Sequence, residues 1–465
     1  MSINSKLKSI IISMVALFLL VGCNDTPSVV NSNSTLEVSN NKKADKTIIK
    51  YTQSSISLTS DIEAAIMNYN ENYSDGYVVE LIKIPTDRYN DTINMLLSSG
   101  EGPDVFEAQY EWLHSYILIN WLYDLKDNID DDFLNLFPKW AIELAYDSKF
   151  NNHLYSFPST QSTFRLIYNK DLFRKAGLNP DRPPETLDDL MSYAEKITEV
   201  GRGFGKYGFG LAASDIWNGF VLPMEAVNSY SGVYFFDYGE GKYDLNVYKP
   251  WFKTLMGLKE GGNIFPGEMT MKEDLALLQF AEGNIGMMYA ESNVPILMKK
   301  LFSVKCDWDV AMPPIIDKNY NKGYIGTSLS GWQVVNEKTP NPKEAIAFWK
   351  YLYSQEYNTK LFKGGYSLPI IKDIMNNNQN DPFNIPKFDK FMPSDKDIVF
   401  PSTPLDIDEC VRGNVYNSIF KGSVPLDIGL ANETYRLNML LDKYKISGKI
   451  DINKYIRQSF GAFGH

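Results

Sequence analysis

Alternating strand-like and helix-like segments with short connections constrain the fold of this chain most strongly. The run TIIKYTQSS is rich in β-branched residues and predicts a strand from Thr47. The next run, SDIEAAIMNYNENY, has apolar residues at helical spacing, namely Ile62, Ala65, Ile66 and Tyr69. Strand-like YVVELIKIP, helical YNDTINMLLSSG and strand-like PDVFEAQ follow. Strands that alternate with helices in this way form parallel sheets from βαβ units, so we expect an α/β fold.

Later segments predict a second sheet with covering helices. GFGLAAS, NIGMMYAES and WDVAMPP are apolar runs bounded by Gly, Pro or polar residues, which is typical of buried strands. Thr186 and Asn341 are the expected N-caps of two helices, and Glu344 completes a capping box with Asn341. A chain of 465 residues exceeds a single ordinary core, so we expect two lobes.

The N-terminus has the layout of an export signal. The apolar run from Ile10 to Val21 is shorter than the ~20 residues needed to cross a bilayer, and Lys6 and Lys8 precede it. The sequence LVGC resembles the lipobox of bacterial lipoproteins, which implies cleavage before Cys23 and lipidation of its thiol. The alternative is an ordinary signal peptide with a chance cysteine. The polar stretch after Cys23 predicts a flexible tether.

Composition narrows the classes of function. A net charge of -11 disfavours nucleic acid, whose phosphates require clustered Lys and Arg. With only three His residues, the chain has few candidates for a zinc ligand or for the base of a Ser–His pair, so we predict no metal and no cofactor. For Cys306 and Cys410 we expect two buried free thiols, with a disulfide between them as the alternative. Aromatic residues make up 14% of the chain, which favours stacking against flat ligand faces.

Two sequence patterns point toward enzymes, and both are weak. GFGKYG carries the glycine spacing of a dinucleotide loop at Gly203, Gly205 and Gly208, but a predicted helix precedes it and a predicted strand follows. A glycine-rich turn is therefore the better interpretation. Paired carboxylates for glycoside hydrolysis are not excluded by sequence, because their separation depends on the fold. Glu111 and Glu291 stand out among the acids, and each also has an explanation in ligand binding.

Several stretches, taken in order, resemble family 1 extracellular solute-binding proteins of ABC importers, the group that includes maltose-binding protein. They are LLSSGEGPDVFEAQ, WLYDLKD, LYSFPSTQSTFRLIYNKDLFRKAGLNPDRPPETLDDLMSYAEKIT, FAEGNIGMMYAESN and GWQVVNEKTPNPKEAIAFWKYLYSQEYNTKLFKGGYSLPI. The resemblance implies a periplasmic-binding-protein-like α/β fold of type II, with two lobes joined by crossover hinge strands. We expect a signal peptide at 1–22, a tether at 23–45, lobe one at 46–160 and 326–373, and lobe two at 161–325 and 374–465.

The resemblance also suggests residues that face the ligand between the lobes. Trp217, Trp332 and Tyr366 are the expected aromatic platforms, and core packing is the alternative for each Trp. Glu111 and Glu291 are expected polar clamps, for which a surface or lobe-closing salt bridge is the alternative. The full set of expected ligand contacts is Gln109, Tyr110, Glu111, Ser159, Thr160, Gln161, Trp217, Glu291, Ser292, Trp332 and Tyr366.

The sequence therefore predicts a non-enzymatic, monomeric binding protein, lipid-anchored at Cys23 on the extracytoplasmic face of the cell membrane. It would capture a sugar or oligosaccharide and deliver it to the transmembrane subunits of an ABC permease. One alternative is the same fold with a non-sugar solute, such as a polyamine or a peptide. The other is a secreted glycoside-acting enzyme.

Overall fold

The structure, a computed structural model, describes residues 46–54, 59–146, 150, 153–320, 323–378, 384–405 and 409–457. The predicted signal peptide, the tether and Cys23 lie outside the described residues, as do the side chains of Glu111 and Cys410. Within the described ranges, none of the helices combines the length and the apolarity needed to cross a bilayer. Cys306 is a free thiol.

The first sheet contains the predicted N-terminal strands. Its order is β13-β3-β1-β2, with β1 (Thr47–Thr52) parallel to both β2 (Tyr77–Leu81) and β3 (Val105–Ala108), and β13 (Trp332–Val335) antiparallel to β3. Helices α1 (Thr59–Asn72) and α2 (Tyr89–Ser99) connect these strands, which confirms the βαβ prediction. All four predicted apolar positions of α1 are buried: Ile62, Ala65, Ile66 and Tyr69.

A second sheet contains the three later strands that the sequence predicted. Its order is β10-β5-β9-β6, formed by β10 (Trp308–Ala311), β5 (Phe164–Asn169), β9 (Ile285–Glu291) and β6 (Tyr207–Phe209). Helix α7 (Leu187–Gly201) packs against β6, and Gly208 permits the close approach, because a Cβ there would lie 2.1 Å from the carbonyl oxygen of Ala194. The glycine-rich motif is thus a helix-to-strand turn, as interpreted from the sequence.

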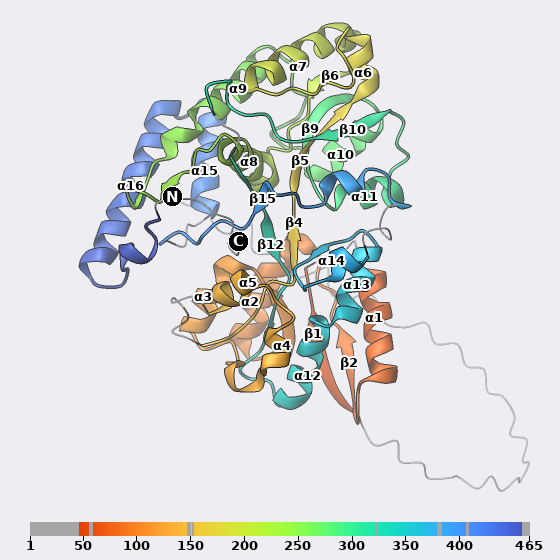
Figure 1. Cartoon of the computed structure of the whole chain (residues 1–465), viewed down its shortest axis with the longest axis vertical. Coiled ribbons are helices and arrows are strands. Elements are labelled where there is room, and N and C mark those ends of the chain that lie inside the picture. Colours follow the sequence, from red (N-terminus) through yellow and green to blue (C-terminus); the bar gives the residue numbers. More distant parts are fainter. Residues whose placement is uncertain are drawn as a thin grey trace, which may run out of the picture. The chain divides into compact units, whose positions relative to one another are not determined.

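A small sheet of three short strands lies between the two larger sheets, and two of its strands carry the chain from one to the other (Figure 1 labels both, β4 and β12). In this small sheet, β4 (Thr160–Ser162) pairs antiparallel with both β12 (Ser328–Ser330) and β14 (Leu368–Pro369). Strand β4 leads directly into β5 of the second sheet, and β12 leads into β13 of the first. Two further pairings are β11 (Ile325–Gly326) with β15 (Asp397–Ile398), and β7 (Phe236–Asp237) with β8 (Lys242–Tyr243).

The remaining helices cover the sheets and fill the C-terminal part. They are α3 (Tyr110–Leu118), α4 (Asp131–Leu134), α5 (Lys139–Ala145), α6 (Lys170–Lys175), α8 (Leu222–Tyr230), α9 (Lys249–Glu260), α10 (Glu273–Ala281), α11 (Val294–Leu301), α12 (Pro342–Leu352), α13 (Gln355–Lys363), α14 (Ile374–Asn377), α15 (Glu409–Phe420) and α16 (Leu426–Ile446). A π-helical turn, Trp217–Val221, leads into α8. Figure 1 shows α7 and α9 on the side of the second sheet, and α1 and α12 beside the first.

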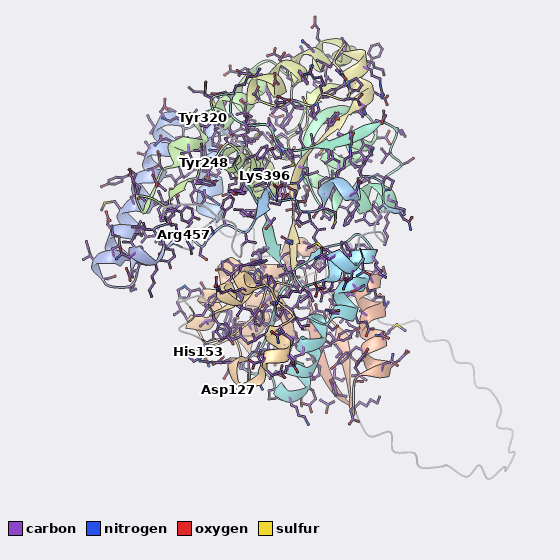
Figure 2. The ribbon with its side chains drawn as sticks, viewed as in Figure 1. Asp127, His153, Tyr248, Tyr320, Lys396 and Arg457 are labelled. Carbon is purple, nitrogen blue, oxygen red and sulfur yellow. The ribbon has the colours of Figure 1, made fainter. Side chains whose placement is uncertain are left out.

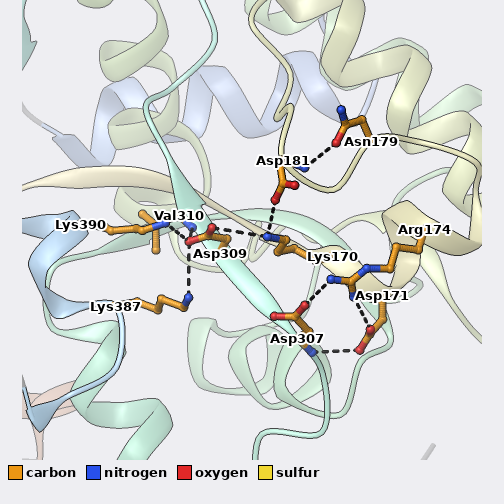
Figure 3. A network of polar contacts seen from close by, with 10 residues as sticks. All are labelled: Lys170, Asp171, Arg174, Asn179, Asp181, Asp307, Asp309, Val310, Lys387 and Lys390. Atoms are coloured by element: carbon orange, nitrogen blue, oxygen red, sulfur yellow. Dashed lines mark hydrogen bonds and ion pairs between the residues drawn. The ribbon is translucent and has the colours of Figure 1, made fainter.

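Residues 384–405, here called the strap, are held to the second sheet by ion pairs. Lys390 and Lys387 both contact the carboxylate of Asp309 on β10, and Lys387 Nζ lies 3.8 Å from it (Figure 3). Lys170 reaches the same carboxylate at 4.0 Å and pairs with Asp181 at 2.6 Å. These contacts with distant residues hold the strap in place.

The two predicted helix caps have different outcomes. The Thr186 hydroxyl accepts a hydrogen bond from the backbone N–H of Asp189, and the Asp189 carboxylate accepts one from the N–H of Thr186. At α12, Pro342 begins the helix as predicted, but Asn341 makes no side-chain capping bond. The capping box at Asn341 and Glu344 is therefore wrong, because Asn341 has a ψ of 59°, outside the extended conformation that lets a cap reach the first turn.

Replacing Thr186 tests whether its capping bond stabilises α7. Thr186→Ala removes the acceptor for the Asp189 N–H, so we expect a loss of about 1 kcal/mol of unfolding free energy, measured by urea denaturation. Thr186→Ser keeps the hydroxyl and should remain within a few tenths of a kcal/mol of the parent protein. An equal loss in both variants would mean that the methyl group of Thr186, and not its cap, carries the effect.

Candidate functional site

A cavity of about 350 Å³ lies where residues of the first-sheet side meet residues of the second-sheet side and of the strap. Its wall includes Tyr110 from α3 and Trp332 from β13 on one side, and Trp217 from the π-helical turn on the other. These three were predicted ligand contacts, and the fold brings them to one cavity from far apart in the chain.

Tyr110 and Trp332 form one aromatic wall of the cavity. Their ring centroids are 4.7 Å apart, with an angle of 34° between the ring planes. Trp332 is only 2% exposed and belongs to the core around β3 and α3, so it serves packing and cavity lining together. Within the described residues its buried indole N–H has no hydrogen-bond partner. An unsatisfied buried donor in a cavity wall suits a ligand hydroxyl, because leaving such a donor unpaired costs about 1–3 kcal/mol.

Trp217 is positioned by a tight turn on the opposite wall. The Asp215 carboxylate accepts hydrogen bonds from the backbone N–H groups of Trp217 and Asn218 at 3.1 and 3.2 Å. Gly219 is required next, because a Cβ there would stand 2.4 Å from the carbonyl oxygen of Ala212. The turn therefore fixes the backbone from which the half-buried Trp217 side chain reaches the cavity.

Sequence reasoning missed a second group of aromatic residues in the wall. Tyr234 and Phe400 contact each other edge to face with centroids 5.2 Å apart, and Phe164, Phe235 and Tyr238 also line the cavity. Phe400 belongs to the strap, and the others follow α8 or begin β5. Their aromatic character is visible in the run VYFFDY, but nothing in its spacing separates a wall from a core.

An ion pair between a buried Arg and a partly exposed Glu also lines the cavity and was not predicted. Arg412 of α15 is 2% exposed, and its Nη1 lies 3.2 Å from Glu225 Oε1 of α8. The guanidinium carbon stands 5.4 Å from the ring centroid of Phe235. Arg412 and Glu225 supply donors and acceptors in a wall rich in aromatic residues, as sites for polar organic ligands commonly require.

Glu291 and Ser292, at the end of β9, lie outside the wall of this cavity. Burial raises the pKa of Glu291 to about 8, with contributions from the nearby Glu273 and Asp215 carboxylates. Burial likewise raises the pKa of Glu273 to about 7, with a contribution from Asp215, although a hydrogen bond from Asn218 at 2.5 Å opposes the shift. These acids form a separate cluster beneath the Trp217 turn.

The other predicted contacts are placed at the crossovers and around α3. Ser159 donates its N–H to the carbonyl of Ser330 at 3.1 Å, and the Thr160 hydroxyl contacts that of Ser330 at 2.8 Å. Gln161 pairs with β12 and β14. Gln109 directly precedes α3 without a side-chain capping bond, and its side-chain oxygen accepts a hydrogen bond from Asn90. Lys300 Nζ stands 4.4 Å above the ring of Tyr366. The structure does not describe the side chain of Glu111.

The potential metal ligands in the described part of the chain do not form a metal centre. No group of three or more His, Cys, Asp or Glu side chains is arranged there to hold a metal ion. The cavity itself offers aromatic faces, one ion pair and several hydroxyl groups. Such an arrangement can bind a polar organic molecule with flat apolar faces.

The raised pKa of Glu291 predicts a pH dependence of stability. Because the folded state holds this proton more tightly than the unfolded chain, stability should rise as pH falls from about 8 toward the ordinary Glu range near 4.5. Glu291→Gln removes the ionised form. We therefore expect the free energy of unfolding to exceed that of the parent protein by roughly 1–3 kcal/mol at pH 9, and the difference to vanish near pH 4.5. Thermal unfolding across pH measures this, with Glu260→Gln on the exposed end of α9 as the charge control. A pH-independent difference would contradict the assignment.

Known proteins resemble this chain in both sequence and structure. The maltotriose-binding protein of Pyrococcus abyssi is 25% identical over 315 residues, which is 65% of this chain and 63% of that protein. The sn-glycerol-3-phosphate-binding periplasmic protein UgpB of Escherichia coli K12 is 44% identical over 89 residues, 18% of this chain and 19% of that protein. Each match thus spans less than two thirds of the relative's own length.

A solved structure supports the fold. The ABC transporter solute-binding protein of Thermotoga lettingae, bound with α-D-tagatose, superposes with a TM-score of 0.68 at 22% identity, over 85% of this chain and 99% of that one. The expected α/β periplasmic-binding-protein fold is thereby confirmed. Residues 54–359 match the family model described as bacterial extracellular solute-binding protein. The chain therefore belongs to the bacterial extracellular solute-binding protein family.

Proposed function

We propose that this protein captures a sugar or oligosaccharide in the aromatic cavity and delivers it to an ABC permease. The observation that carries the proposal is that Trp217 and the contacting rings of Tyr110 and Trp332 line one cavity. Indole and phenol faces pack well on the C–H faces of a pyranose ring. The maltotriose-binding and tagatose-bound relatives point to the same class of ligand.

Polar groups in the wall complete the chemistry of a sugar site. The Glu225 carboxylate and the Arg412 guanidinium would accept from and donate to ring hydroxyls, and the indole N–H of Trp332 would donate to one. Buried polar groups that pair only with the correct ligand give strong discrimination, because a ligand without the matching hydroxyl leaves them unpaired.

The non-sugar alternatives receive less support from the cavity. A polyamine needs carboxylates in place of aromatic faces, yet Asp215, Glu273 and Glu291 lie outside the cavity wall. A phosphoester, suggested by the relative that binds glycerol 3-phosphate, needs an available cation, and Arg412 is already paired with Glu225. The binding experiment described below therefore includes polyamines and glycerol 3-phosphate beside the sugars.

Ligand capture would use the two lobes expected from the sequence, residues 46–160 with 326–373 and residues 161–325 with 374–465. Walls that belong to different lobes can close on a ligand by a hinge at the crossover strands β4 and β12. We further propose that Cys23 carries a lipid that holds the protein at the membrane through the 23–45 tether. These features fit extracellular capture followed by delivery to a permease.

Binding should appear first as ligand-dependent stability. A saccharide present at 100 times its Kd is expected to add about 2.7 kcal/mol to the free energy of unfolding, which appears as a rise in the melting temperature. The panel contains mono- and oligosaccharides, polyamines, peptides and glycerol 3-phosphate. A response limited to polyamines or to glycerol 3-phosphate would overturn the sugar proposal. Release of reducing ends from an oligosaccharide would instead favour the glycoside-acting enzyme.

Removing one aromatic platform tests the role of the cavity. Trp217→Ala should weaken binding of the responding saccharide about tenfold, because a ring face contributes about 1–2 kcal/mol. Trp112→Ala is the matched control, since Trp112 is 39% exposed and stacks on Tyr116 away from the cavity wall. Titration calorimetry of both variants gives the comparison. Equal weakening in the two would place the sugar elsewhere.

A further inference from the structure

Helix α16 is apolar on two opposite faces. Its inner face packs into the core around the second sheet through Leu430, Leu437 and Leu441, each at most 1% exposed. Its outer face carries four large apolar side chains whose exposed fractions range from 52% to 88%. These four, here called the outer stripe, are Ile428, Tyr435, Met439 and Ile446. A surface helix ordinarily has polar residues on its outer face, so the outer stripe indicates a surface that another molecule covers.

The outer stripe is straight and long. Its residues are separated by 7, 4 and 7 positions. At about 100° per residue, all four therefore lie within about 20° of one line parallel to the helix axis, over a length of about 27 Å. Figure 1 shows α16, in blue, at the outer edge of the second-sheet side of the molecule. The structure describes every residue of α16, and none of them lines the aromatic cavity.

The spacing of the outer stripe is symmetric about Leu437. This residue is midway between Ile428 and Ile446, and also midway between Tyr435 and Met439. A second copy of α16 that packs antiparallel, with a two-fold axis level with Leu437, therefore meets the stripe with an identical stripe. Ile428 then faces Ile446 of the second copy, and Tyr435 faces Met439. Two-fold dimers use one self-complementary patch on both copies, and the stripe has this property.

The polar residues of the outer face fit the same antiparallel direction. Asn432 and Asp442 occupy the two gaps in the stripe, and the two-fold axis places each level with the other. Asp427 in the first turn comes within two residue levels of Lys445 in the last turn of the second copy, whereas a parallel pair would place like charges level. Within one copy Asp427 pairs with Lys249 at 2.7 Å, and Lys445 pairs with Asp442 at 3.1 Å. Because these charges are exposed, they select the orientation more than they stabilise the contact.

We propose that the outer stripe of α16 is the interface of a two-fold symmetric homodimer. One helix face is small for a specific interface, which usually buries at least about 1,000 Å² in total, so association is reversible and concentration-dependent. The dimer replaces the monomer expected from the sequence. Because α16 lies outside the cavity wall, the interface uses no residue of the proposed sugar site.

Sedimentation equilibrium of protein that begins at residue 24 tests the proposal, and we expect a monomer–dimer equilibrium. Tyr435→Lys/Met439→Lys places cations at the centre of the stripe and should weaken dimerisation at least tenfold. Leu118→Lys/Ile119→Lys is the matched control, because these residues at the end of α3 are 73% and 53% exposed, and it should leave dimerisation unchanged. Thermal unfolding of each variant checks that the fold is intact.

Cysteine variants test the antiparallel register. In the dimer, the thiols introduced by Ile428→Cys alone, or by Ile446→Cys alone, are about 27 Å apart. A short bismaleimide should therefore link neither variant beyond the level of the parent protein, which carries Cys306 and Cys410. An equal mixture of the two variants should give linked dimers, because the symmetry brings these positions together. Linking of Ile428→Cys to itself would indicate a parallel pair and overturn the proposal.

Two other occupants of the stripe are distinguished by the same protein. The described chain ends at Arg457, labelled in Figure 2, whose N–H donates to the carbonyl of Tyr238 at 2.8 Å. Dimerisation only after removal of residues 458–465 would mean that this segment covers the stripe. A monomer that binds phosphatidylglycerol vesicles through Tyr435 and Met439 would mean that a membrane surface does. Either result would overturn the homodimer, as would a protein that stays monomeric at every concentration or equal weakening of dimerisation by both double variants.

Discussion

The arrangement of the cavity depends on one crowded junction between the crossover strands. Gly331 has a φ of 72°, and a Cβ at this position would lie 2.0 Å from Ser159 Oγ. Its N–H donates to the half-buried carboxylate of Glu107 at 3.3 Å, and the same carboxylate accepts from the N–H of Ser54 at 3.1 Å. Glycine is required here because other residues meet both a disfavoured backbone conformation and a steric clash. Trp332 follows immediately, so this junction sets where its ring enters the cavity wall.

The two aromatic walls have different mechanical support, which matters for ligand capture. Trp332 is part of the core around β3 and α3, so its ring moves only with that core. Trp217 stands on a turn held by the Asp215 carboxylate and packed on α15 through Gly413, whose Cβ would lie 2.2 Å from Ile216. Each platform is therefore rigid within its own core. In the proposed capture of a ligand, adjustment would then fall on the short crossover strands and not on the platforms themselves.

The sequence predicted the parts of the fold that depend on local periodicity. The βαβ order, the buried face of α1 and the capping box at Thr186 are encoded within a few residues of one another. Of the site, Tyr110, Trp217 and Trp332 were named because family resemblance places them at strand and helix ends. Tyr234, Phe400 and Arg412 were missed, because their role depends on contacts between distant segments. The bond from Tyr238 to Pro401 spans 163 residues, and no local pattern encodes it.

A buried ion pair connects the second sheet to the wall of the cavity. The guanidinium of Arg165 on β5 donates to both carboxylate oxygens of Asp397 at 2.7 Å, and the two side chains are 2% and 0% exposed. Ser394 donates two further bonds to this carboxylate, so its charge is well compensated. Asp397 begins β15 only three residues before Phe400. Because a bidentate pair fixes direction as well as distance, it orients the strap where the strap begins to line the cavity. The pair is therefore better understood as a positioning device for the strap than as a source of stability, since desolvation offsets much of the attraction in buried pairs.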